Sequence, residues 1–463
     1  MCDLACLLLS MNDLRRCMNL KMEGNMKEKQ LLCNPFCNPA MIQELEKGRI
    51  MEIAPDVWEI EGFAGTMFFI EPPSGNIFIL RDGDLVLLMD TGHHPFYRER
   101  ILGILKKFRE EGARELVLVM SHGHWDHGKN NDIIYEAGYE KARFLLPENE
   151  FPTLNIPAHM LGDAAKAVEY FDPGRLVAGG FKVFLQWAKN FPEYGDECYR
   201  EAWALIEALP DEYDSSKTRV AWEALLTKVL CPDLRSYLID RAEPLTLASR
   251  EKRTYGGVEF TGWPVGRFFL IHDASQSPGH ICIYDPKHKL MITGDATLEI
   301  NPPFFDCDFG ACIDICAKCL MLAEAGGILI AADCHRTSQW WPRSLGAWGV
   351  KPLDPLQFVD YARGTGECAA FYRLWLEYFR SLREETLLAA SRIGEATVPE
   401  IVAELSKSQD RNVVFKFGLR LPNIPSSPEM LVTRVLVESG AARRVEGERI
   451  LLKAPEKWNF KNV

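Results

Sequence analysis

Three histidines and one aspartate lie within a single short stretch of this chain. Residues 121–128 read Ser-His-Gly-His-Trp-Asp-His-Gly, whereas the whole chain of 463 residues contains ten histidines. Neutral imidazoles and carboxylates are the side chains that bind zinc, iron and manganese in proteins. The clustering therefore predicts a metal site. Its expected ligands are His122, His124, Asp126 and His127.

Further residues of the same chemical kind follow apolar runs in distant parts of the sequence. Asp90 follows Leu-Val-Leu-Leu-Met, Asp295 follows Leu-Met-Ile-Thr-Gly, and His335 follows Ile-Leu-Ile-Ala-Ala within three residues. Apolar runs of this length are typical of buried strands. Because functional residues often lie on loops at strand ends, we expect one edge of a sheet to bring these residues to the histidine cluster.

The elements around these residues indicate an α/β fold, since strands and helices alternate along the chain. The expected strands of the first half lie at 57–60, 67–70, 77–80, 85–89 and 116–120, with a helix at 97–111. A stretch with helical spacing follows. Strands then return at 257–260, 267–272, 281–284, 290–293 and 328–332, with a helix at 311–325.

Composition and charge limit the classes of protein to which the chain can belong. A net charge of −12 argues against nucleic-acid binding, because phosphate contacts depend on clustered Lys and Arg. No apolar stretch reaches the roughly 20 residues that span a bilayer, so we expect neither membrane insertion nor a secretory signal. Fourteen cysteines without an export signal indicate a cytoplasmic location, where thiols stay reduced.

Four of the cysteines lie close together, at 307, 312, 316 and 319. The last three repeat at the spacing of one helix face, and buried free cysteine behaves as a small apolar residue. This spacing favours a place in the core. An iron–sulfur or zinc site is the alternative, although the ferredoxin spacings differ.

Four motifs give the chain a resemblance to the metallo-β-lactamase fold superfamily, in its hydrolase branch with glyoxalase II-like and lactonase-like members. They are Asp90-Thr91-Gly92, the His-x-His-x-Asp-His pattern at 122–127, Thr293-Gly294-Asp295 and the late His335. The resemblance covers about residues 50–345 and is interrupted by the helical stretch. The His-x-His-x-Asp-His pattern is its specific part.

This resemblance implies a four-layer αβ/βα sandwich with one or two bound metal ions. In that pattern, the ligands of the first ion include His122 and His124, those of the second are Asp126, His127 and His335, and Asp295 bridges both. Asp90 supports the histidine loop by hydrogen bonding and is not a ligand. Asp126 is also the candidate catalytic residue. Zinc is the expected metal, with iron or manganese as alternatives.

One position departs from the family pattern, which supplies a third histidine to the first ion in a phrase like Thr-Pro-Gly-His-Ser-Pro-Gly-His. Residues 273–280 read Asp-Ala-Ser-Gln-Ser-Pro-Gly-His, which puts Gln276 in the ligand position and matches His280 to the second, non-ligating histidine. A neutral amide oxygen is a poorer zinc ligand than imidazole. We therefore expect a first site that is weakened, empty or occupied by a harder ion. A shifted loop in which His280 binds the metal is the alternative.

The chain divides into a sandwich domain and several additions. We expect a poorly ordered N-terminal arm at 1–48, the sandwich at 49–150 and 251–345, a helical insertion or cap at 151–250, a helical linker at 346–379 and a small winged-helix-like α+β module at 380–463. The nearly balanced charge of the last module favours a protein contact, such as a homodimer interface, over nucleic acid.

The favoured function is a metal-dependent hydrolase that acts on a small-molecule substrate. Two divalent ions lower the pKa of a bound water and polarise a carbonyl oxygen. The resulting metal-bound hydroxide would cleave an ester, thioester or lactone, and the insertion would cap the site. Three alternatives remain: a phosphodiesterase or ribonuclease, a single-iron oxygenase, and a non-hydrolytic binding protein that lost catalysis through Gln276.

Overall fold

The computed structural model describes residues 48–62, 74–188, 197–230, 237–298, 300–335, 361–410, 412–413, 416, 426–444 and 449–452. The expectations for the N-terminal arm up to residue 47, for a strand at 67–70 and for the linker up to residue 360 lie outside these residues. Among the described residues, no helix combines the length and the apolar character needed to cross a membrane.

Within the described residues, the first sheet contains seven strands in sequential order. They are β1 (Ile50–Ala54), β2 (Val57–Ile60), β3 (Ile77–Asp82), β4 (Leu85–Met89), β5 (Glu115–Val119), β6 (Lys141–Pro147) and β7 (Glu243–Leu245). Strands β1 to β4 pair antiparallel, whereas β4 to β7 pair parallel. Helix α4 (Tyr97–Glu110) packs Ile101, Leu105 and Phe108 on the outer face, and the short helix α5 (Ile133–Glu136) lies beside it.

The described part of the second sheet also contains seven strands in sequential order. They are β8 (Glu251–Tyr255), β9 (Val258–Val265), β10 (Phe268–His272), β11 (Ile281–Asp285), β12 (Leu290–Ile292), β13 (Ile330–Ala332) and β14 (Ala362–Arg363). All pairs are antiparallel except β12 with β13, which run parallel. Helices α10 (Phe309–Glu324) and α12 (Gly364–Ile393) cover the outer face.

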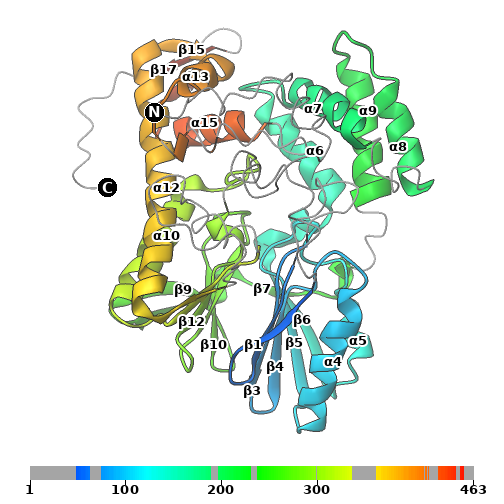
Figure 1. Ribbon diagram of the computed structural model, residues 1–463, viewed down its shortest axis with the longest axis vertical. Helices are drawn as coiled ribbons and strands as arrows, with labels where there is room; N and C mark the ends of the chain where they lie inside the picture. The colour runs from blue at the N-terminus through cyan, green and yellow to red at the C-terminus, as the bar shows by residue number, and fades with distance from the viewer. Residues whose placement is uncertain are drawn as a thin grey trace, which may run out of the picture.

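The two sheets pack face to face. Phe78, Leu87 and Val117 of the first sheet share a buried cluster with Leu270 and Ile283 of the second. The order of layers is α10 and α12, second sheet, first sheet, then α4 and α5 (Figure 1). The predicted α/β class with a four-layer αβ/βα sandwich is therefore confirmed.

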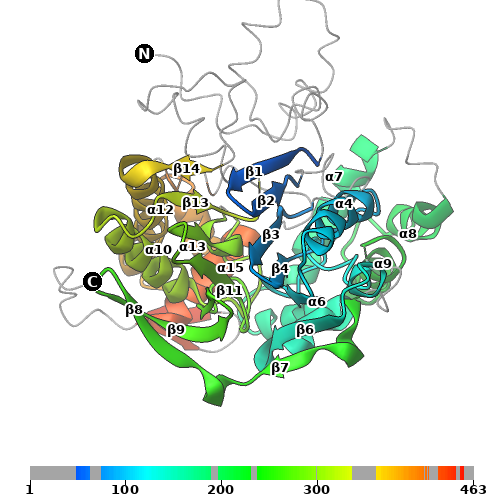
Figure 2. The same ribbon diagram turned by 90° about the horizontal axis from the view of Figure 1, so that it is seen from below.

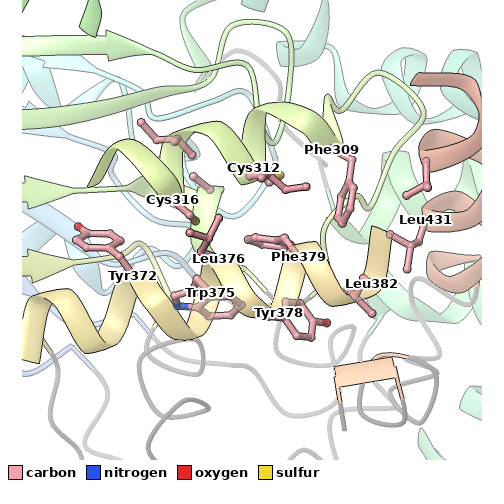
Figure 3. Close-up of a cluster of buried hydrophobic side chains, with 14 of the residues drawn as sticks. Phe309, Cys312, Cys316, Tyr372, Trp375, Leu376, Tyr378, Phe379, Leu382 and Leu431 are labelled. Atoms are coloured by element: carbon pink, nitrogen blue, oxygen red, sulfur yellow. The ribbon is translucent and has the colours of Figure 1, made fainter. Parts of the chain in front are cut away.

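The cysteines of α10 lie in the core, as their spacing predicts. Cys312, Cys316 and Cys319 are fully or almost fully buried and belong to the cluster between α10 and the second sheet. Figure 3 shows Cys312 and Cys316 on the side of α10 that faces Trp375 and Phe379 of α12. They act here as small apolar side chains.

The part of the chain that lies between strands β6 and β8 in the sequence forms a helical insertion. Its helices are α6 (Ile156–Ala167), α7 (Pro173–Ala188), α8 (Glu197–Glu207) and α9 (Ser215–Ala224), with the short turns η3 (Glu148–Leu154), η5 (Leu225–Leu230), η7 (Ile239–Arg241) and η8 (Leu247–Ser249). The insertion lies on the α4 side of the sandwich (Figure 2). Strand β7 returns to the first sheet before residue 251, so the sandwich resumes earlier than the expected boundary.

The C-terminal elements are α13 (Val398–Leu405), α15 (Ser427–Glu438) and a three-stranded sheet in the order β15, β17, β16. The strands are β15 (Glu395–Thr397), β16 (Ala442–Arg444) and β17 (Arg449–Leu452). Helix α12 runs without a break through the expected boundary at 380, because its buried face packs first on α10 and then on α13 and α15. The assignment of these elements to the winged-helix type stays a prediction.

Candidate metal centre

The candidate residues lie at one edge of each sheet. Asp90 and the histidine loop follow the parallel neighbours β4 and β5, and Asp295 and His335 follow the parallel neighbours β12 and β13. The carboxyl ends of parallel neighbours lie at the same edge of a sheet, which brings the following loops together. Asp295 lies in the short turn η9 (Gly294–Thr297).

The first group of residues lies around His122. Its Nε2 atom is 2.9 Å from Nδ1 of His124 and 3.6 Å from Oδ2 of Asp295. The Nε2 atom of Gln276 lies 3.3 Å from the same Asp295 oxygen. These four side chains are almost completely buried, with at most 5% of any of them exposed. The structure therefore gathers two imidazoles, an amide and a carboxylate, which together can hold one ion.

The second group lies on the other side of Asp295. Nε2 of His335 is 3.2 Å from Oδ2 of Asp126 and 3.3 Å from Oδ1 of Asp295. Nε2 of His127 is 3.6 Å from Oδ1 of Asp126 and 3.6 Å from Oδ2 of Asp295. Asp295 therefore contacts both groups, in the position expected of a bridging ligand.

The donor atoms of this centre fit a bound cation. Two sets of three residues have their donor atoms within 4.8 Å of one another: His122, His127 and Asp295 form one, and Asp126, His127 and His335 form the other. Several buried atoms in the centre have no hydrogen-bond partner, namely Nε2 of His124, His127 and His335, Oδ1 of Asp295 and Oε1 of Gln276. Unpaired buried polar atoms are costly, and a divalent ion would satisfy those that face it. The donor set of nitrogen and oxygen suits zinc, iron or manganese.

Asp90 supports the histidine loop from behind. Its carboxylate accepts hydrogen bonds from the backbone N–H of Ser121 at 2.7 Å and from the Ser121 hydroxyl at 2.7 Å. The same carboxylate lies 2.9 Å from Nδ1 of His127. A hydrogen bond at Nδ1 leaves Nε2 of His127 directed at the centre, which is how carboxylates commonly orient metal-binding histidines. Asp90 has a left-handed backbone with φ of 62°, a conformation unusual for a residue other than glycine.

Gln276 and His280 occupy different environments. Both ring nitrogens of His280 are engaged: Nδ1 lies 2.9 Å from the Asp273 carboxylate, and Nε2 accepts the backbone N–H of Asp295 at 3.1 Å. His280 therefore supports the turn around Asp295, whereas Gln276 contacts the Asp295 carboxylate itself. This placement favours Gln276 over His280 as the occupant of the ligand position.

The two groups of ligands differ in their protonation. Burial lowers the pKa of His124 to about 3 and that of His122 well below its usual range, so both rings are neutral. For His335, burial opposes the charged form, but Asp295 and Asp126 outweigh it and raise the pKa to about 10. Asp126, Asp295 and Asp90 likewise raise the pKa of His127 well above its usual range. Without a cation, protons on the second group balance the carboxylates, and metal binding would displace them.

Some residues around the centre were not expected from the sequence. Glu150 is completely buried and contacts the loops on both sides of the first group. It follows strand β6, so the strand-end rule that selects Asp90 also applies to it. His159 and Phe304 pack near His124, with ring centroids 6.1 Å and 4.7 Å from it. His159 belongs to the insertion, and no sequence spacing connects it to the histidine loop.

A family model described as the Metallo-beta-lactamase superfamily matches residues 70–141. This segment contains Asp90 and the complete histidine loop. The match supports the metallo-β-lactamase superfamily, whose members are mostly hydrolases. A search of curated proteins gave no significant match.

Several solved structures are similar in fold. One is a metallo-beta-lactamase family protein from Thermus thermophilus, with 16% identity and a TM-score of 0.41, covering 87% of this chain and 100% of that one. A stereoselective inverting sec-alkylsulfatase from Pseudomonas sp. has 17% identity and a TM-score of 0.45, covering 84% of this chain and 50% of that one. A beta-lactamase domain protein from Burkholderia ambifaria has 12% identity and a TM-score of 0.44, covering 89% and 96% of the two chains.

Proposed function

We propose that the protein is a metal-dependent hydrolase of the metallo-β-lactamase superfamily. The observation that carries this proposal is the meeting of six side chains able to bind a metal, from three loops, with the Asp295 carboxylate at their centre. They are His122, His124, Asp126, His127, Asp295 and His335. A surface loop with unrelated histidines would not bury these groups or leave their nitrogens without hydrogen bonds.

Each residue has a distinct role in this proposal. His122, His124 and Gln276 hold the first ion, Asp126, His127 and His335 hold the second, and Asp295 contacts both. Bound divalent ions of this kind lower the pKa of a water molecule and polarise the substrate oxygen. Asp90 orients His127, and burial of the whole centre excludes bulk water, which strengthens its electrostatic interactions.

The substrate is a small molecule with an ester, thioester or lactone bond, as in the glyoxalase II-like and lactonase-like branch. The insertion supports this proposal because its helix α6 brings His159 to within 6.1 Å of His124. Phe304 packs against both rings, with centroids 4.7 Å from His124 and 5.6 Å from His159. One aromatic ring and one neutral imidazole beside the first metal position suit an acyl group with an apolar part.

Gln276 favours a second candidate, a centre with a single ion. Its amide contributes no charge and replaces the imidazole of the family pattern, so the first ion would be held less tightly. A protein with one ion at Asp126, His127, His335 and Asp295 could serve single-iron oxygen chemistry or bind a ligand without hydrolysing it. The number and identity of the bound ions distinguish these candidates.

Metal analysis and a substrate panel test the proposal. We expect purified protein to contain zinc or another divalent ion, and to cleave a thioester or a lactone in preference to a bis-nitrophenyl phosphate. Asp295→Ala should abolish metal binding and cleavage, and His127→Ala should abolish cleavage and the binding of the second ion. The matched control is His288→Ala, in the distant turn between β11 and β12, where His288 bonds to Asp285. Cleavage that survives in both site variants would reject the metal mechanism.

A further inference from the structure

Glu150 connects the two loops that carry the ligands of the first metal position. It lies in the turn η3, directly after strand β6, and its side chain is completely buried. Oε1 accepts the backbone N–H of Gly123, at 2.6 Å, between His122 and His124. Oε2 accepts the Ser277 hydroxyl at 2.8 Å and the backbone N–H of Gly279 at 2.7 Å. Each carboxylate oxygen therefore holds one of the two loops.

This carboxylate is fully satisfied although it is buried. Burial raises the pKa of Glu150, while hydrogen bonds from Thr153, Ser277, Gly123 and Gly279 act in the opposite direction. The single hydroxyl proton of Thr153 is shared between Oε1 and the Glu150 backbone carbonyl, so Oε1 accepts one full hydrogen bond and one shared one, and Oε2 accepts two. Burying a carboxylate costs free energy unless hydrogen bonds satisfy it, so the loss of any one of these contacts would be destabilising. The arrangement is therefore a built connection between two loops that are far apart in the sequence.

Two glycines allow the loops to approach Glu150 closely. A Cβ atom at Gly123 would lie 2.0 Å from Oγ1 of Thr153, and one at Gly279 would lie 2.5 Å from Cβ of Glu150. Both distances are far below van der Waals contact. The glycine in His-Gly-His is thus required by the position of Thr153, which bonds to Glu150, and the glycine before His280 by the position of Glu150 itself. This is a reason independent of the metal.

The second metal position has a different support. Asp90 contacts Ser121 and His127, and Glu150 contacts neither of them. The ligands on the two sides of Glu150 are His122 and His124 in one loop and Gln276 in the other. We infer that Glu150 is the positioning residue of the first metal position, where it sets the spacing between the imidazole pair and the Gln276 amide. This inference rests on the proposed metal centre.

The test is Glu150→Gln, compared with Glu148→Gln as a control. A glutamine has one acceptor oxygen, so one of the two loops must lose its anchor and face an amide N–H instead. Glu148 lies in the same turn but is exposed. Within the described residues, its carboxylate accepts one hydrogen bond, from the backbone N–H of Leu247. Titration of metal-free protein with Zn²⁺ against a competing chelator should give two equivalents for the wild type. Loss of a residue that orients ligands typically costs about 10-fold to 100-fold in metal affinity.

We expect Glu150→Gln to weaken one equivalent by at least about tenfold and to leave the other unchanged. Cobalt absorption with Co²⁺ alone should show the same loss of one environment, and Glu148→Gln should behave as the wild type. Ser277→Ala removes one of the four bonds and should weaken the same equivalent by a smaller factor. It serves as the test if Glu150→Gln does not fold.

Other outcomes overturn the inference. If Glu150→Gln, or Ser277→Ala in its place, leaves both equivalents unchanged or weakens both equally, Glu150 does not position the first site. A wild type that takes up one ion, unaffected by these variants, also overturns the inference but leaves a single-ion function in place. A wild type that takes up no ion defeats the proposed function itself, so the two failures are distinguishable.

Discussion

The first and second proposed metal positions share Asp295 but differ in charge and in support. The second position has its own carboxylate, Asp126, and two imidazoles whose pKa values are raised by the surrounding carboxylates. The first has two neutral imidazoles and the uncharged amide of Gln276. A cation gains more from negative ligands in a buried site. The second position should therefore bind its ion more tightly than the first.

This difference indicates a division of labour. The second position has the features of a site that keeps its ion, because Asp90 orients His127 and this position carries most of the negative charge. The first position faces the insertion through His124, His159 and Phe304. We expect the second ion to be retained during purification and the first to decide which metals and substrates the protein accepts.

The largest effect is expected for Asp295→Asn, because both positions use this carboxylate. Its oxygens lie within 3.6 Å of His122, His127 and His335, and the amide would remove the shared negative charge. Hydrolysis should fall by roughly 10³-fold or more, with loss of both ions. Metal content and initial rates measure this, with Asp314→Asn on the exposed face of α10 as the control. Retention of two ions would show that Asp295 does not bridge them.

The next prediction compares His335→Ala with His124→Ala at limiting metal. If the second position is the tighter one, the first equivalent of Zn²⁺ occupies it in the wild type. His335→Ala should then weaken this equivalent by about 100-fold or more, whereas His124→Ala should leave it almost unchanged. Competition with a chelator gives both affinities. The reverse pattern would invert the comparison between the two positions.

Gln276→His is expected to strengthen the first position. An imidazole is a better ligand for zinc than an amide oxygen, and the residue already lies beside the Asp295 carboxylate. The second equivalent of Zn²⁺ should bind about tenfold more tightly or better. His280→Gln is the matched variant, since it exchanges the same two residue types at the neighbouring position. His280→Gln should not tighten this equivalent. If Gln276→His does not tighten it either, Gln276 is not one of the ligands.

The fold class, and the meeting of the candidate residues at one place, could be predicted from the sequence. Apolar runs end just before Asp90, the histidine loop, Asp295 and His335, and parallel strand pairing brings these ends together. These signals are local, so each can be read from a few residues. The assignment of each side chain to an ion is a prediction that metal analysis must test.

Other features depend on contacts between distant segments, which spacing alone does not reveal. In the sequence, Glu150 looks like any other acidic residue. Its role becomes visible only in the fold, where the backbone N–H groups of Gly123 and Gly279 bond to its carboxylate. Helix α12 crosses the expected boundary at 380 because it packs on α10 before this residue and on α13 and α15 after it. Strand β7 has only three residues, one of which is proline, and so carries little strand signal.

The smallest effect concerns Asp163, which supports the wall of the first position. Asp163 lies one turn after His159 on α6 and accepts the backbone N–H groups of Phe305 and Asp306 at 2.9 Å and 3.1 Å. Burial raises its pKa to about 7, against about 3.9 for an unfolded aspartate. The folded state then keeps a proton that the unfolded state has lost between these values. The stability contribution of this group is therefore present at low pH and lost as the pH rises through 7.

Asp163→Asn should remove this pH dependence. The free energy of unfolding of the wild type, relative to the variant, should fall between about pH 4 and 7 by roughly 1.4 kcal/mol per pH unit at most, and then level off. Urea unfolding of metal-free protein measures it, with Asp240→Asn at an exposed carboxylate as the control. A constant difference across this range would mean that Asp163 is ionised throughout. In that case the segment at 304–306 beside His124 is held by a charged group across this pH range.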